Sequence, residues 1–365
     1  MIRSNKSGIW KYEALLPNIS TDNQVTLGEG NTPLVKSRNI GRELGLNHLY
    51  YKLESANPTG SYKDRIAAVG VSWALEQGKE ACIGTTSGNA GASIAAYAAS
   101  SGLPYHLLVL ESILEAKLMQ VVVYDAQVKK IKGFGESAAV GSKVFTYIDE
   151  QSVKNNWEVL ITAFKFNPTA MMGVKTISYE LFNDFGGQSP DAVFIPVGGG
   201  GLFTGIAKGF EDVVQHEKDA RFPSLVAVQS AGCSNIVQAW KLGEAEPVPG
   251  DSTSQISGLQ VPNSLDGKEV LEVLNAGNGW GESVPDTSTW SWQERLASRD
   301  GILCEPASAI TMAAVEQALQ AGRIHKDSVV VCVISGAGYK DMGRVQAIVN
   351  TKNEVPLVEI DSLLS

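Results

Sequence analysis

Short apolar runs alternate with helical patterns through most of the 365-residue chain. Near-continuous apolar strands separated by helices are typical of parallel sheets that are covered on both faces. The pattern therefore predicts an α/β fold, in which ligands bind in the loops after the carboxyl ends of the strands. We expect strands at residues 81–84, 105–110, 159–163, 192–197, 225–229 and 329–334, and helices at residues 64–77, 89–101, 137–155, 174–184, 202–216 and 307–321.

Composition narrows the class of protein further. The formal net charge of −9 argues against nucleic acid or an anionic membrane surface as the main partner. The four cysteines are widely spaced and include no CxxC pair, which argues against a disulfide framework or a bound metal. Residues 1–12 lack the apolar core of a signal peptide, and no apolar run approaches the roughly 20 residues of a membrane span. We therefore expect a cytoplasmic protein.

The chain is long enough for two domains or for one large α/β domain. We expect a smaller α/β domain over residues 57–159 and a larger one built from residues 1–56 and 160–365. Residues 243–286 are rich in Gly, Pro, Asn and Ser. We expect this stretch to wind over the surface, with one short helix near residues 268–274.

A single lysine, Lys63, stands between an Asn-Pro-Thr-Gly turn and the helix expected from residue 64. A lysine fixed there by the fold can form a Schiff base with an aldehyde cofactor, since desolvation lowers its pKa. Taken alone, the stretch is explained as well by a surface lysine in a first helical turn. Three loops elsewhere, each after an expected strand, favour the Schiff-base interpretation.

The first loop, residues 85–93, contains Thr86, Ser87, Gly88, Asn89 and Ala90 at the start of an expected helix. Backbone N–H groups at a helix start, together with hydroxyls, form an anion site that fits a substrate carboxylate. Asn89 has an amide that can hydrogen-bond a phenolic oxygen. An ordinary helix cap is the alternative interpretation of the same residues.

The other two loops follow the strands expected at residues 192–197 and 329–334. Four glycines, Gly198, Gly199, Gly200 and Gly201, let the backbone approach a ligand closely, and a phosphate is the natural occupant. A tight turn remains the alternative for this loop. Ser335 begins a Ser-Gly-Ala-Gly sequence, where a neutral hydroxyl can bind a pyridine nitrogen and leave it unprotonated. A routine strand-end hydroxyl is the alternative for Ser335.

Together these motifs resemble the threonine synthase family of fold-type II pyridoxal-phosphate enzymes. Residues 27–34, 57–65, 301–309 and 335–341 are similar to that family's motifs and occur in the same order. The resemblance implies a tryptophan synthase β-like fold with two α/β domains, mostly parallel sheets and pyridoxal 5'-phosphate in the cleft between them. It further implies that Lys63 is the Schiff-base lysine and proton shuttle, that Asn89 contacts the phenolic oxygen of the cofactor, that Gly198 to Gly201 bind its phosphate, that Ser335 binds its ring nitrogen, and that Thr86 to Ala90 hold the substrate carboxylate.

The chain departs from the family pattern at the pocket for the substrate phosphate. That pocket normally uses an Asn-Ser pair before an Asn-Pro and an arginine after it. Here Phe164, Lys165 and Phe166 precede Asn167-Pro168, and Ala170 stands where the arginine is expected. Loss of a bidentate cation should weaken phosphate binding unless Lys165 compensates. The glycine loop, in addition, is more similar to that of serine/threonine dehydratases.

The resemblance implies a lyase for amino-acid biosynthesis, acting by elimination or replacement at Cβ or Cγ of O-phosphohomoserine or a related amino acid. One alternative is a serine/threonine dehydratase, and another is a β-replacement synthase with an O-phosphoserine-like substrate. A non-catalytic cofactor-binding protein is disfavoured, because the lysine and the three loops would have no evident reason to coexist. From the family we expect a homodimer.

Overall fold

The computed structural model describes residues 4–86, 88–111, 113, 115–134, 137–248 and 250–364. The strands are β1 (Leu34–Lys36), β2 (His48–Lys52), β3 (Ala81–Thr85), β4 (Tyr105–Leu110), β5 (Gln127–Ile131), β6 (Trp157–Val159), β7 (Ala192–Pro196), β8 (Ser224–Ser230), β9 (Gly279–Val284) and β10 (Val329–Val333). The α-helices are α1 (Ile40–Leu44), α2 (Lys63–Glu76), α3 (Asn89–Ser101), α4 (Glu115–Val123), α5 (Ala138–Lys154), α6 (Pro168–Met171), α7 (Thr176–Asp184), α8 (Gly201–His216), α9 (Asn235–Leu242), α10 (Gly267–Asn275), α11 (Asp286–Asp300), α12 (Pro306–Gln320), α13 (Met342–Val349) and α14 (Asp361–Leu364). Short 3₁₀ helices are η1 (Gly8–Leu15), η2 (Thr21–Asn23), η3 (Glu54–Ala56), η4 (Met172–Lys175), η5 (Ala231–Cys233) and η6 (Gly338–Asp341).

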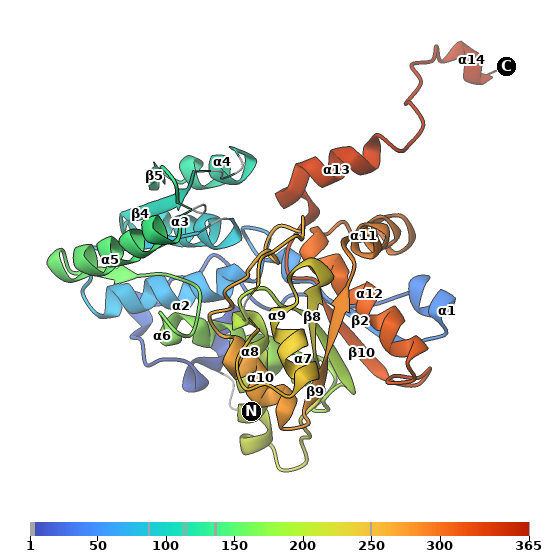
Figure 1. Ribbon diagram of the computed structural model, residues 1–365, viewed down its shortest axis with the longest axis horizontal. Helices are drawn as coiled ribbons and strands as arrows, with labels where there is room; N and C mark the ends of the chain where they lie inside the picture. Colours follow the sequence, from blue (N-terminus) through green and yellow to red (C-terminus); the bar gives the residue numbers. More distant parts are fainter. Residues whose placement is uncertain are drawn as a thin grey trace.

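These strands form two sheets. The larger sheet has the order β1-β2-β10-β7-β8-β9, and the smaller has the order β5-β4-β3-β6. Within the described residues, neighbouring strands pair in parallel except β1 with β2. In Figure 1 the smaller sheet and its helices α3, α4 and α5 lie to one side of the larger sheet. The expected α/β fold with mostly parallel sheets is confirmed.

The central strand β7 is apolar throughout because both of its faces are buried. Val193 and Ile195 point into one core, which includes residues of α8 such as Phe203 and Ile206. Phe194 points into the other core, which includes residues of α12 such as Ala313. Since successive side chains of a strand point to opposite faces, a strand covered by helices on both sides needs apolar residues at every position.

Two segments differ from the sequence-based expectations. The strand expected at residues 159–163 is instead β6, which ends at Val159. Leu160 still donates a hydrogen bond to Ile83 of β3, but the chain then turns, and Ala163 donates to Ile161. The stretch 243–286 does not simply wind over the surface. It adds β9 to the edge of the larger sheet, and it buries Ile256 and Leu259 in the core.

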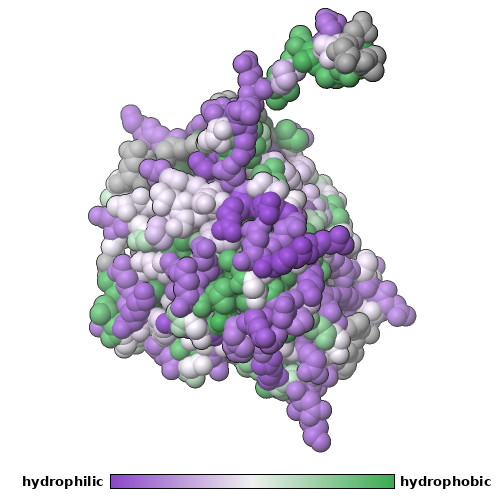
Figure 2. Space-filling model, turned by 90° about the vertical axis from the view of Figure 1, so that its right-hand side faces the viewer, coloured by the Kyte–Doolittle hydropathy of each residue, from purple (hydrophilic) through white to green (hydrophobic). Residues whose placement is uncertain are grey.

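The smaller sheet comes from residues 81–159, and the larger sheet from residues 34–52 and 192–333. The two domains expected over residues 57–159 and over residues 1–56 with 160–365 remain a prediction. From residue 351 the chain extends away from the body and carries exposed apolar side chains such as Leu357 and Ile360 (Figures 1 and 2). Within the described part of the chain, no helix has the length and apolar character needed to cross a membrane.

Candidate active site

A cavity of about 800 Å³ lies where the loops after β3, β7 and β10 meet the start of α2. Its lining includes most of the expected site residues, namely Lys63, Thr86, Gly88, Asn89, Ala90, Gly198, Gly199, Gly200, Gly201 and Ser335. Ser87 lies outside the described residues. Lys165 is exposed and is not part of the lining. The fold thus brings the lysine and the three loops to one place.

Lys63 is the first residue of α2. Its Nζ donates a hydrogen bond of 2.7 Å to Oγ1 of Thr162, which follows β6. The same Nζ lies 4.8 Å from the centre of the Tyr62 ring. A hydroxyl and an aromatic face therefore hold the amine at the wall of the cavity.

The turn before Lys63 is fixed by Asp64 and Gly60. The carboxylate of Asp64 accepts from the backbone N–H of Thr59 at 2.7 Å and from its hydroxyl at 2.5 Å, and Thr59 also contacts Ser93 of α3 at 2.9 Å. Burial raises the pKa of Asp64, and the bonds from Ser93 and Thr59 act against this shift. Gly60 has φ +86°, and a Cβ there would lie 2.2 Å from the Tyr339 hydroxyl. Only glycine suits this position.

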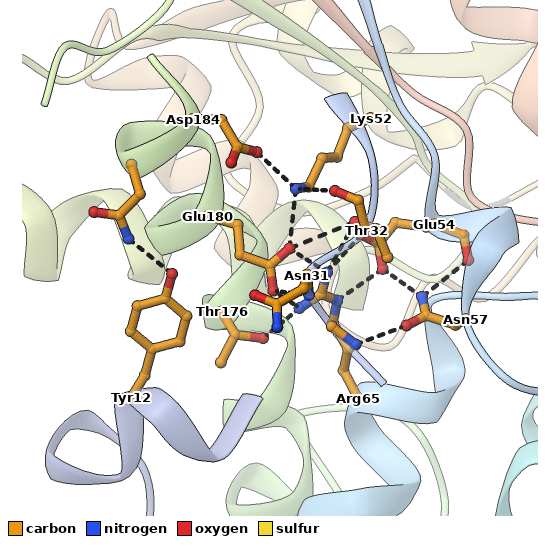
Figure 3. A network of polar contacts seen from close by, with 12 residues as sticks. Tyr12, Asn31, Thr32, Lys52, Glu54, Asn57, Arg65, Thr176, Glu180 and Asp184 are labelled. Atoms are coloured by element: carbon orange, nitrogen blue, oxygen red, sulfur yellow. Dashed lines mark hydrogen bonds and ion pairs between the residues drawn. The ribbon is translucent and has the colours of Figure 1, made fainter. Parts of the chain in front are cut away.

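Arg65, two residues after Lys63 in α2, belongs to a buried network of charges (Figure 3). The guanidinium of Arg65 binds Glu54 with two bonds of 2.7 Å and Glu180 with bonds of 2.7 and 2.8 Å. Lys52 adds contacts of 2.9 Å to Glu180 and to Asp184. Arg65, Lys52 and Glu54 are fully buried. The network joins the first turn of α2 to η3, β2 and α7, so it fixes the direction in which Lys63 leaves the helix.

The charges of this network decide the protonation of Glu180. Burial alone would raise the pKa of Glu180, but the neighbouring Arg65 and Lys52 outweigh burial and hold this pKa well below its usual range. Glu180 is therefore ionised at neutral pH. A buried carboxylate in this state is stable only because both cations stay in place.

The glycine loop lies against the segment 258–266. A Cβ at Gly198 would lie 2.4 Å from the carbonyl oxygen of Gly258, and one at Gly200, where φ is +104°, would lie 2.5 Å from that of Asp266. Gly199 accepts a 2.8 Å bond from the N–H of Asp266, yet a Cβ there would meet no atom closer than 3.9 Å. Close packing therefore explains Gly198 and Gly200, whereas Gly199 faces open space at the start of α8.

Asn89 and Ser335 both contact Glu305, a residue of the lining to which sequence reasoning assigned no role. Asn89 Nδ2 donates to Glu305 Oε2 at 3.1 Å, and the Ser335 hydroxyl lies 3.3 Å from Oε1. Ser335 also contacts Ser308 of α12 at 3.0 Å. Glu305 belongs to the motif 301–309, so its position in that motif was the available signal.

Asp266 is a second lining residue that sequence reasoning missed. Its carboxylate accepts from the backbone N–H groups of Phe164 and Lys165 at 3.0 and 3.1 Å. The pKa of Asp266 is raised because burial outweighs the opposing effect of these two bonds and of the charge of Lys63. No sequence signal marked this residue, because it lies in the stretch that we expected at the surface.

The altered stretch 164–170 supplies no cation to the cavity lining. Phe164 contacts Lys208, whose Nζ lies 5.7 Å from the ring centre, and Phe166 stacks on Phe145 at 5.4 Å. Ala170 is buried, where a Cβ on Gly70 of α2 would lie 3.0 Å from it. The backbone at residues 164 and 165 is bonded to Asp266, and Asn167 is buried and hydrogen-bonded to the Val159 carbonyl and to the Ala170 N–H. Phe164 and Phe166 make aromatic contacts, and Lys165 is exposed.

These residues fit pyridoxal phosphate. The cavity combines an amine, a glycine loop at a helix start, an amide and a hydroxyl, which match the aldehyde, phosphate, phenolic oxygen and ring nitrogen of the cofactor. The sequence model of the family described as pyridoxal-phosphate dependent enzyme matches residues 25–336.

Curated relatives carry the name threonine synthase. The protein from Methanocaldococcus jannaschii is 34% identical over 93% of this chain and 82% of its own length. The protein from Halalkalibacterium halodurans is 33% identical over 94% of this chain and 92% of its own length.

Solved structures with the same fold include enzymes with other names. The processed form of threonine deaminase isoform 2 from Solanum lycopersicum has a TM-score of 0.71 at 18% identity, with 96% of both chains covered. Maize serine racemase has a TM-score of 0.70 at 20% identity, over 88% of this chain and 93% of its own. At such identities the likeness concerns the fold alone. The family match and the curated relatives, together with this fold, make the chain a member of the threonine synthase family of pyridoxal-phosphate dependent enzymes.

Proposed function

We propose that the protein releases phosphate from O-phosphohomoserine, or from a closely related amino acid, and adds water to form a hydroxy amino acid. Membership of the family makes the chain a pyridoxal-phosphate dependent lyase that acts on carbon–oxygen bonds. The single observation that carries the choice of substrate is the identity of 33–34% to relatives named threonine synthase over more than nine-tenths of the chain.

The lining residues take the following roles in this proposal. When bound, pyridoxal phosphate withdraws electrons from the substrate carbon atoms and so makes the Cα proton acidic. Lys63 holds the cofactor covalently and, once released, takes the proton from Cα. The neutral hydroxyl of Ser335 hydrogen-bonds the ring nitrogen, and Asn89 hydrogen-bonds the phenolic oxygen.

Anions bind at two helix starts. The N–H groups of Gly198 to Gly201 at the start of α8 receive the cofactor phosphate. The segment around the start of α3 receives the substrate carboxylate, with Thr86, Ser87 and Gly88 before the helix and Ala90 in its first turn. Its backbone is held in part by the bond of 3.1 Å from the N–H of Gly88 to the Thr86 hydroxyl.

A dehydratase of serine or threonine is the second candidate. The stretch 164–170 contributes no cation to the cavity, as suits a substrate with an uncharged side chain. The glycine loop favours the same activity. A β-replacement synthase that uses an O-phosphoserine-like substrate is a further variant of the first proposal.

We also propose that the protein acts in the cytoplasm as a homodimer. The biosynthetic relatives support the compartment, and the family resemblance supports the dimer. Light scattering coupled to size-exclusion chromatography tests the assembly, and a mass of about 39 kDa in solution would contradict it.

One experiment separates the candidate activities. The cofactor-loaded protein is offered O-phosphohomoserine, threonine, serine and O-phosphoserine in parallel, and phosphate, threonine, 2-oxo acid and ammonia are measured. Phosphate together with threonine from O-phosphohomoserine is the expected result. Production of 2-oxo acid and ammonia from threonine or serine, without phosphate release from O-phosphohomoserine, would replace the first proposal by the dehydratase.

A further inference from the structure

Arg344 is a cation of the cavity lining that lies outside every motif discussed above. It belongs to the first turn of α13, where the carboxylate of Asp341 accepts from its backbone N–H at 3.2 Å. Its guanidinium carbon lies 4.9 Å from the centre of the Trp290 ring of α11. The stacking and the helix cap together hold the side chain in one direction.

The guanidinium of Arg344 has unused hydrogen-bond donors. Its Nε is buried and has no hydrogen-bond partner. Within the part of the chain that the structure describes, the guanidinium makes no hydrogen bond or ion pair, and it stacks on the Trp290 ring. A partly buried cation without a counter-charge is costly unless a ligand supplies the charge.

The acidic groups of the lining do not supply this charge, because each is engaged elsewhere. Glu305 accepts from Asn89 and Ser335, and Asp266 accepts from backbone N–H groups of the stretch 164–165. The carboxylate of Asp341 caps α13 by accepting from the backbone N–H of Arg344, and it makes no bond with the Arg344 guanidinium.

Few positive charges from the described part of the chain line the cavity. Among the described residues that line the cavity, the lysine and arginine side chains are those of Lys63 and Arg344, and Lys63 is assigned to the cofactor in the proposed function. Lys165 is exposed, and Lys208 lies over the Phe164 ring. A substrate phosphate therefore finds its cation at α13 and not in the stretch 164–170.

We propose that Arg344 binds the distal anionic group of the substrate, a phosphate ester on the amino-acid side chain. This inference rests on the proposed function and names the residue that selects its substrate class. The planar guanidinium binds two phosphate oxygens at once, and stacking on Trp290 orients it before the substrate arrives.

The test measures binding to the cofactor-loaded enzyme by rapid-mixing absorbance of the lysine-linked cofactor, before product accumulates. Two matched pairs of probes are used: O-phospho-L-homoserine with L-homoserine, and O-phospho-L-serine with L-serine. Arg344→Gln is expected to raise Kd for a phosphorylated probe by about 10- to 100-fold, as for the loss of charge-assisted hydrogen bonds. Kd for the unphosphorylated probes should change by less than about twofold, and Arg344→Lys should recover part of the affinity, because a point charge remains.

Arg295→Gln is the matched control. Arg295 also stacks on a tryptophan of α11, at 3.7 Å from the Trp292 ring centre, but it pairs with Glu43 and lies outside the lining. This variant should bind all four probes as the unmodified enzyme does.

Two results would overturn the inference. One is an equal loss of affinity for both members of a pair in Arg344→Gln, and the other is a wild-type enzyme that binds neither phosphorylated probe more tightly than its partner. Failure of the proposed function has a different signature. It appears as wild-type protein that binds O-phospho-L-homoserine in an Arg344-dependent manner but forms no threonine.

Discussion

Two arginines, each near the start of a helix, show opposite ways of using a buried positive charge. Arg65 in the first turn of α2 is surrounded by the carboxylates of Glu54 and Glu180, and all its contacts lie within the protein. Arg344 in the first turn of α13 is half-buried, stacks on Trp290 and leaves its guanidinium N–H donors unused by the described residues.

The difference indicates which charge serves the scaffold and which serves a ligand. A charge that is paired on all sides resists motion, and its removal leaves other buried charges without partners. A charge without partners contributes little to the fold, but it is ready for an anion. The region of α2 should therefore respond to mutation through stability, and the region of α13 through binding.

Removal of Lys63 should produce the largest effect and sharpen the comparison. We expect Lys63→Ala to lower turnover by at least about 10³-fold, because the covalent link and the proton acceptor are both lost. With both proteins measured free of cofactor, the free energy of unfolding should change by less than about 1 kcal/mol, unlike that of a variant of Arg65. Borohydride reduction followed by peptide mass spectrometry measures the link. Cofactor fixed to another lysine would contradict the assignment.

Removal of Arg65 should act on stability first. We expect Arg65→Met to lower the free energy of unfolding by about 3–5 kcal/mol, because Glu54 loses its cationic partner and Glu180 keeps only Lys52 of its two. Urea unfolding measures this change. Arg295→Met is the surface control and should cost less than about 1 kcal/mol. Equal losses in the two variants would break the distinction between buried scaffold and surface charge.

Acid should destabilise the charge network that Glu180 forms with Arg65 and Lys52. The pKa of Glu180 is lower in the folded protein than its usual value of about 4.3. A carboxyl with a lowered folded-state pKa stabilises the fold above its unfolded-state pKa, and this stabilisation is lost as the pH falls through the folded-state value. We expect the free energy of unfolding to fall as pH decreases below about 4.3, with a smaller slope in Glu180→Gln. Parallel slopes in the two proteins would assign the acid sensitivity to other groups.

The smallest expected effect is on the stability of an Arg344 variant without ligand. Arg344→Gln should change the free energy of unfolding by less than about 1 kcal/mol, because within the described residues the stacking on Trp290 is lost but no ion pair is. Urea unfolding of the cofactor-loaded protein measures it. A loss above about 2 kcal/mol would give Arg344 a structural role and remove the contrast with Arg65.

Much of the fold could be predicted because its strands are apolar runs between helices. The strand at residues 105–110 and the helix at residues 89–101 were predicted with the bounds that the structure has. Strands β1 and β2 were missed, since they are short and carry polar residues such as His48 and Lys52. Lys52 is buried there because Glu180 and Asp184 neutralise it, and this contact between distant segments leaves no local signal.

The candidate site also contains residues that the sequence could identify and residues that it could not. Lys63, Asn89, the glycine loop and Ser335 lie in local motifs, so the sequence marked them and the fold brings them to one cavity. Asp266 and Arg344 stand in stretches without a motif, and they reach the cavity only through the path of the chain. Sequence also left the position of Lys165 open, since a side chain next to a turn can point to either side, and the structure has it exposed.

The contact of the glycine loop with Gly258 and Asp266 would couple the proposed binding of the cofactor phosphate to the stability of the segment 258–266. If the loop binds the phosphate as proposed, it supports both the cofactor and this segment, and a chain without cofactor should hold the segment less firmly. A ligand at 100 times its Kd adds about 2.7 kcal/mol to the folded state by mass action. Newly made chains without cofactor would therefore expose residues 243–266 to proteases more often than loaded chains. The abundance of the enzyme in the cell would follow the availability of pyridoxal phosphate.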